Sequence, residues 1–133
     1  MPIPTTILRK SLGASADVSK IWFEDRTQPK TRETFFAKGK LGDDGTGAVY
    51  VYYDEKGEAL YVGITSRRVK SRLHDQTSPH KKKKWWNEWG FMRFVQLSDD
   101  MDRQILEFLL ILSYSPKYNE KPKAKNLDEL LPS

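Results

Sequence analysis

The chain has 133 residues and a formal charge of +5, with 38% hydrophobic and 12% aromatic residues, which suits one modest domain with a single core. Because the chain contains no cysteine, disulfides, thiolate metal sites and cysteine nucleophiles are excluded. No apolar run approaches the roughly 18 residues of a membrane span and no signal-peptide pattern opens the chain, so we expect a soluble, cytoplasmic protein with no membrane partner.

Residues 1–45 form a weakly patterned N-terminal extension that ends in a Gly/Asp-rich, linker-like stretch. Within it, the segment ADVSKIWFEDR predicts a short helix that packs on the core through Ile21, Trp22 and Phe23. We expect the ordered domain over residues 46–120 and a loosely attached C-terminal tail over residues 121–133.

The firmest local pattern is a β-hairpin. The run AVYVYY is β-branched and aromatic, DEKG is a turn, and EALYVGI is a second strand-like run. If residues 54–57 form a four-residue loop, the register places Tyr50 directly opposite Tyr61, on the same face of the sheet.

A helix is predicted after the hairpin, in TSRRVKSRLHDQ. Thr65 or Ser66 can cap it, and Val69 and Leu73 lie four residues apart, which gives an apolar stripe flanked by Arg72. Residues 64–84 carry eight lysines and arginines against one acid, a contribution of +7. This concentration is typical of a surface that faces phosphate, although a solvated helix face and a charged loop have the same composition.

The C-terminal part of the domain predicts one strand and one long helix. The run GFMRFVQL (residues 90–97) alternates as a third strand should, and SDDMDRQILEFLLILSYS begins with acidic capping residues before an apolar helix that Pro116 ends. Within ILEFLLIL the only polar side chain is Glu107. A carboxylate there needs a cation, a metal or a proton, and a salt bridge to Arg103 one turn earlier is the plain structural alternative.

Five elements in order resemble one known family. The tripeptide AVY (residues 48–50), ten residues and then YVG (residues 61–63) resemble the two-part signature of the GIY-YIG nucleases. Arg72 in SRL, Glu107 in LEFLLI and Asn119 in SPKYN follow at similar spacings. The resemblance implies an α+β domain, in which helices flank a small three-stranded antiparallel sheet, and it implies metal-dependent cleavage of DNA.

The resemblance also implies a role for each residue of the signature. Glu107 would hold a single Mg²⁺ or Mn²⁺, and Arg72 would steady the scissile phosphate. Tyr50 and Tyr61 would flank the attacking water and orient or deprotonate it, and Asn119 would brace the site. A tyrosine with a pKa near 10 needs cations nearby to act as a base at pH 7.

This chain departs from the family pattern at three positions. Ala48 replaces the first glycine, which matters only if that backbone needs a positive φ. Arg72 falls one residue later than in many members, and Gln76 stands where many members carry a histidine. Two other hypotheses therefore stay open beside the endonuclease: a non-cleaving nucleic-acid binding module on the same fold, and an interaction domain whose Glu107 is only ion-paired.

The stretch HKKKKWWNEW (residues 80–89) divides by residue type. The lysines can track a DNA backbone as point charges, and the three tryptophans suit the core, with base stacking by Trp85 or Trp86 as the alternative. The sequence leaves open a protein partner or a homodimer. The predicted DNA contacts are Arg67, Arg68, Lys70, His80, Lys81, Lys82, Lys83, Lys84 and Trp85.

Overall fold

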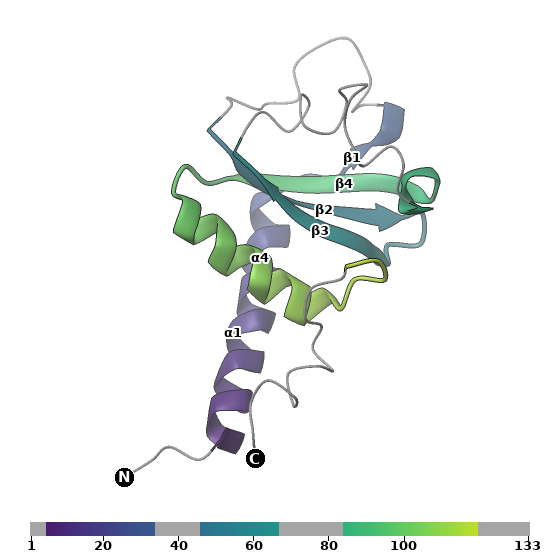
Figure 1. Ribbon diagram of the computed structural model, residues 1–133. Coiled ribbons are helices and arrows are strands. Elements are labelled where there is room, and N and C mark those ends of the chain that lie inside the picture. Colours follow the sequence, from purple (N-terminus) through teal and green to yellow (C-terminus); the bar gives the residue numbers. More distant parts are fainter. Residues whose placement is uncertain (1–4, 34–45, 67–83, 120–133) are drawn as a thin grey trace.

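Four strands and two long helices make up the part of the chain that the computed structural model describes, which is residues 5–33, 46–66 and 84–119. The elements follow in the order α1 (Thr5–Arg26), β1 (Lys30–Thr31), β2 (Ala48–Asp54), β3 (Ala59–Thr65), η2 (Lys84–Asn87), β4 (Trp89–Gln96) and α4 (Asp100–Tyr114). The antiparallel sheet has the strand order β1-β4-β2-β3 (Figure 1). The α+β class is confirmed, and the sheet has four strands rather than three.

β2 lies in the middle of the sheet and is buried on both faces, which explains why its sequence is a continuous apolar run. On one face, Val49 and Val51 pack with Phe23 of α1 and Leu110 of α4. Both helices therefore cover this side of the sheet (Figure 1). On the other face lies a second core, built mainly of tyrosines and tryptophans.

The predicted hairpin is confirmed, but its predicted register is wrong. Tyr50 lies opposite Gly63, and Tyr61 lies opposite Tyr52. The pairing then shifts at a β-bulge. Tyr52 pairs with Tyr61 and Tyr53 pairs with Ala59, so Leu60 is an extra residue between the two pairs. The whole displacement is two residues, so Tyr50 and Tyr61 still lie on the same face, as diagonal neighbours.

The predicted third strand and long helix are confirmed as β4 and α4. Asp99 caps α4, because its carboxylate accepts a hydrogen bond from the Asp102 amide at 2.9 Å. The helix ends at Ser115, which adopts a left-handed backbone with φ 47° directly before Pro116.

The N-terminal extension holds more structure than its pattern indicates. The short predicted helix is the C-terminal half of α1, a helix of 22 residues. Phe23 is fully buried and Trp22 packs partly on the same core, but Ile21 is 69% exposed, so its predicted packing is wrong. Three consecutive residues point in three directions about 100° apart on a helix and do not share one face.

β1 pairs with the outer edge of β4 and was not predicted. It has two residues, too few for an alternation pattern to show. The helix predicted around Arg72 and the predicted tail lie outside the described residues. Among the described residues, no helix is long and apolar enough to cross a membrane.

Candidate active site

Tyr50 and Tyr61 form the centre of the candidate site. Their ring centroids are 6.3 Å apart on the aromatic face of the sheet, and Tyr50 is buried while Tyr61 is partly exposed. A methyl group added at Gly63 would lie 2.5 Å from the Tyr50 hydroxyl oxygen. Position 63 therefore requires glycine, because the Tyr50 ring passes directly over it. The spacing between the two tripeptides brings this glycine opposite Tyr50.

The first departure from the family pattern has little structural cost. Ala48 is buried in the extended backbone of β2 and pairs with Thr65 and Gln96. The left-handed conformation falls one residue earlier, at Gly47, with φ 106°. A side chain there would lie 2.6 Å from the Arg103 guanidinium, so the glycine that the backbone needs is Gly47.

Asn119 holds the outer edge of β3 next to the tyrosines. Its side-chain amide donates to the Val62 carbonyl at 2.8 Å, and its side-chain oxygen accepts from the Val62 amide at 2.8 Å. Two backbone bonds, from Lys117 to Ala59 and from Tyr118 to Leu60, precede it along the same edge. The buried Asn119 thus prolongs a short backbone pairing and fixes the strand between Tyr61 and Gly63.

Glu107 is 7% exposed on α4, which packs against β3 and β2. Arg103, its proposed ion-pair partner one turn earlier, is engaged elsewhere. The Arg103 guanidinium donates to the carbonyls of Leu97 at 2.7 Å and Ser98 at 3.1 Å, and it pairs with Asp100 at 3.3 Å. Arg103 therefore forms its ion pair with Asp100 and not with Glu107, the partner that the plain structural alternative requires.

The tryptophans of η2 and β4 are core residues. Trp85, Trp86 and Trp89 are 1%, 8% and 2% exposed. The ring of Trp85 stacks on Tyr61 with centroids 5.1 Å apart and an interplanar angle of 15°. A nucleic-acid base could reach Trp85 only by displacing this packing, so its burial argues against the base-stacking alternative and for a role in orienting Tyr61.

Arg32 is a positioning residue that the sequence does not reveal. Its guanidinium donates to the Trp86 carbonyl at 2.6 Å and lies over the Trp89 ring, 4.5 Å from the centroid. Burial lowers its pKa from the ordinary value. No local pattern marks it, because 54 residues separate donor and acceptor in the chain.

Tyr52 lies beside the tyrosine pair and is chemically different from it. Burial raises its pKa well above the ordinary value, and the neighbouring Tyr50 raises it further, against the opposing effect of Arg32. Tyr52 is therefore neutral at pH 7 and serves as packing between Trp85 and Trp89, with ring centroids at 4.6 and 4.8 Å.

The described side chains suit a metal ion that keeps most of its water ligands better than one that the protein surrounds with several side-chain ligands. Within residues 5–33, 46–66 and 84–119, no group of three or more His, Cys, Asp or Glu side chains is placed to hold a metal ion. Mg²⁺ commonly keeps several waters and binds through one or two carboxylates together with substrate phosphates. A single carboxylate such as Glu107 suits this manner of binding.

Several predicted site residues cannot be placed relative to these groups. Arg72 lies outside the described residues, and the side chain of Lys84, the first residue of η2, is not described either. The other predicted DNA contacts outside the described part are Arg67, Arg68, Lys70, His80, Lys81, Lys82 and Lys83.

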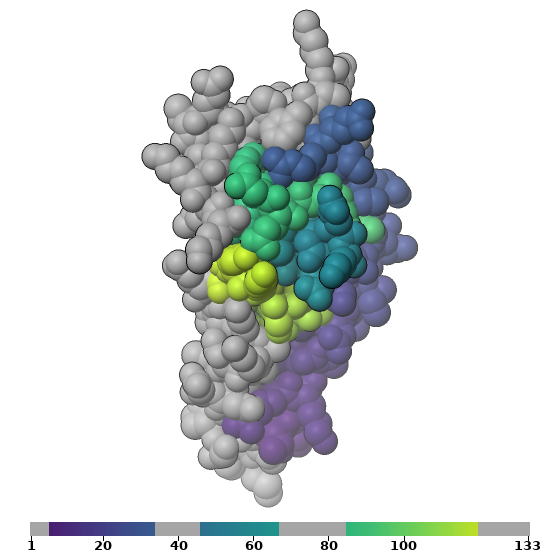
Figure 2. All heavy atoms as spheres, turned by 90° about the vertical axis from the view of Figure 1, so that its right-hand side faces the viewer, coloured from purple at the N-terminus to yellow at the C-terminus, as the bar shows by residue number. Residues whose placement is uncertain are grey.

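One edge of the molecule brings together the tyrosine hairpin, the tryptophan segment and the segment that carries Asn119. Figure 2 faces the side on which the β2–β3 hairpin, the η2 segment and the segment after α4 meet. There the Tyr118 hydroxyl donates to the Glu88 carboxylate, and the Lys117 ammonium lies 3.4 Å from the same group. These contacts tie the segment that carries Asn119 to the loop that carries the tryptophans.

Comparison with known sequences identifies the family. The profile of the UvrC-like GIY-YIG domain matches residues 46–120, more than half of the chain. The chain therefore belongs to this family of nuclease domains.

The chain is similar to proteins named UvrABC system protein C from three organisms. It is 34% identical over 73 residues to that of Methanococcus maripaludis, 33% over 75 residues to that of Syntrophomonas wolfei, and 33% over 91 residues to that of Carboxydothermus hydrogenoformans. The matches cover 53%, 53% and 65% of this chain, but only 14%, 12% and 15% of those proteins. No solved structure matches significantly.

Proposed function

We propose that this chain is a metal-dependent endonuclease that hydrolyses phosphodiester bonds in DNA. The observation that carries the proposal is the placement of Tyr50 and Tyr61 on one face, with Gly63 making room for one ring and Asn119 holding the strand of the other. Such a fixed pair of phenols can position one water between them.

Water activation is the task of the two tyrosines. A phenol loses its proton with difficulty at pH 7, so one of the pair acts as a base only while cations stabilise the phenolate. The other phenol donates or accepts one hydrogen bond and fixes the direction of attack. The packing of Trp85 on Tyr61 keeps that ring from turning away from the water.

Glu107 is the proposed ligand of Mg²⁺ or Mn²⁺. The ion, when bound, polarises the phosphate and stabilises the charge on the leaving oxygen. The low exposure of Glu107 limits the water around the carboxylate, which strengthens its attraction for a cation that binds with the substrate.

Contact with the phosphates is assigned to basic side chains of residues 64–84. Arg72 would hold the scissile phosphate, because a guanidinium can donate two parallel hydrogen bonds to it. The other basic residues proposed above would contact neighbouring phosphates, which fixes position without reading sequence. The names of the relatives describe a larger protein, so this proposal concerns cleavage only and extends to no partner of that system.

The test is an assay of purified protein with supercoiled, linear duplex, single-stranded and branched DNA, with Mg²⁺ or Mn²⁺. We expect cutting that EDTA abolishes and added Mg²⁺ restores. Tyr50→Phe should reduce the rate by about 10²-fold or more, the range in which general acid–base groups act. Glu107→Gln should reduce it at least as far, because it removes the proposed metal ligand.

Tyr53→Phe is the matched control, because Tyr53 is the same residue type on the same strand but lies on the helix-covered face. This variant should cut at the wild-type rate. Cutting that persists undiminished in Glu107→Gln would contradict the assignment. Salt-sensitive binding without cutting under any metal would instead favour the non-cleaving binding module.

A further inference from the structure

Helix α1 carries apolar side chains on two opposite faces. Ala16 and Phe23 are 2% and 0% exposed and face the domain core. On the far side, Ile7, Val18 and Ile21 are 51%, 65% and 69% exposed. Large aliphatic side chains this exposed on one stripe of a helix commonly mark a surface that another chain covers.

The exposed face has the spacing of a helix-pairing seam. Its positions alternate in steps of four and three residues, which keeps one narrow stripe directed at a partner helix. We call this set the α1 seam, and its members are Ile7, Ser11, Ala14, Val18, Ile21 and Asp25. The small Ala14 and Ser11 at its middle permit close approach of a second backbone.

We propose that the α1 seam binds the α1 seam of a second copy of this chain in antiparallel orientation. In that arrangement Ile7 of each copy packs on Val18 of the other, and Ala14 meets Ser11 at the centre. The contact is isologous, so every interaction is made twice.

Charge complementarity selects both the partner and the orientation. Lys10 and Asp17 stand directly before two seam positions, at the flank of the stripe. Antiparallel pairing places Lys10 of one copy beside Asp17 of the other, and the reverse, which gives two ion pairs. Parallel pairing would set Lys10 beside Ser15 and Asp17 beside Trp22, so it would form no such pair.

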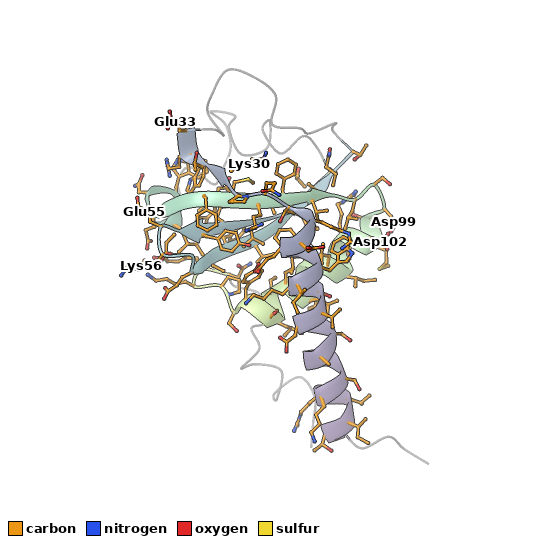
Figure 3. The ribbon with its side chains drawn as sticks, turned by 180° about the vertical axis from the view of Figure 1, so that it is seen from behind. Lys30, Glu33, Glu55, Lys56, Asp99 and Asp102 are labelled. Carbon is orange, nitrogen blue, oxygen red and sulfur yellow. The ribbon has the colours of Figure 1, made fainter. Side chains whose placement is uncertain are left out.

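The length and position of α1 suit pairing with a second helix. The N-terminal half of α1 projects beyond the sheet, and a helix of 22 residues is about 33 Å long (Figures 1 and 3). The apolar surface continues from Val18 into a cavity of about 400 Å³ between α1 and α4, lined also by Trp22, Ile105 and Leu109. The apolar surface of α1 is therefore wider than the seam at this end of the helix.

The first experiment measures association by analytical ultracentrifugation and light scattering, from micromolar to the highest soluble concentration. We expect a monomer–dimer equilibrium. The variant Ile7→Ser/Val18→Ser should raise the dissociation constant about a hundredfold or more, because it removes the Ile7–Val18 contact that the dimer makes twice. Both side chains are exposed in one copy, so circular dichroism should show an unchanged fold.

The second experiment reverses the charges. Lys10→Glu and Asp17→Lys should each raise the dissociation constant about tenfold, and the double variant should restore it, since the pairs re-form with opposite sign. Lys56→Glu is the matched control, because it makes the same charge change at the hairpin tip, away from the N-terminal half of α1 (Figure 3). It should leave association unchanged.

A protein that stays monomeric at every concentration would overturn the proposal. So would a dimer that tolerates the seam variants, a dimer that Lys56→Glu weakens equally, or a double variant that fails to recover. The readout is mass and not cleavage, so it is independent of the proposed nuclease activity.

Discussion

The two faces of the sheet use the same strand for different purposes. On the helix-covered face, Val49 and Val51 meet aliphatic side chains of α4, which need only to fill space. On the aromatic face, Tyr50 and Tyr52 meet rings whose tilt and separation are defined by tryptophans and by Arg32. One face therefore supplies stability, whereas the other also fixes the rings of the two tyrosines proposed to act on the substrate.

The largest expected effects come from removing one core side chain on each face. Trp85→Ala should lower the free energy of unfolding by about 3–5 kcal/mol and Leu110→Ala by about 2–5 kcal/mol, because both are almost fully buried. Denaturant titration measures both. Under conditions where each variant is folded, only Trp85→Ala should also impair cleavage, because only Trp85 stacks on Tyr61. Equal loss of cleavage in both would remove the functional difference between the faces.

A smaller loss of stability with a larger loss of activity is expected at Gly63. In Gly63→Ala the new methyl group would overlap the Tyr50 ring and displace it, at a cost of about 1–3 kcal/mol in unfolding free energy. A misplacement of about 1 Å at a reacting group can reduce the rate about 10²-fold. Cleavage at the wild-type rate with a shifted melting temperature would show that the position of Tyr50 is not critical.

The smallest effects should have opposite signs on the two faces. The Tyr52 hydroxyl is buried with no hydrogen-bond partner among the described residues, so Tyr52→Phe should leave stability unchanged or raise it by up to about 1 kcal/mol. The Tyr53 hydroxyl lies 2.8 Å from the Tyr114 hydroxyl, so Tyr53→Phe should cost about 0.5–1.5 kcal/mol. Denaturant titration of the pair gives the sign. A loss at Tyr52 would indicate that a bound water or another group satisfies its hydroxyl.

Local patterns were sufficient for much of the fold. The hairpin, the third strand, the capped α4 and the stop at Pro116 were all predicted, because turn residues, alternation and capping act over a few neighbouring residues. The same alternation placed Tyr50 and Tyr61 on one face, and a register error of two residues left that conclusion intact. The burial of the tryptophans and of Glu107 followed from their residue types and neighbours.

The sequence alone therefore determined most elements of the domain, namely the hairpin, the third strand and the long helix, since these depend on short-range periodicity, turns and caps. Only the tertiary structure decided the bulge at Leu60, the short β1, the bonds between Asn119 and Val62, and the contact of Arg32 with Trp86. Each of these features joins segments that are distant in the chain or depends on the register of two strands. A pattern of neighbouring residues contains no information on either. The α1 seam depends on sequence and structure together. The sequence contains its spacing, and the structure shows which of the two apolar faces of α1 is exposed.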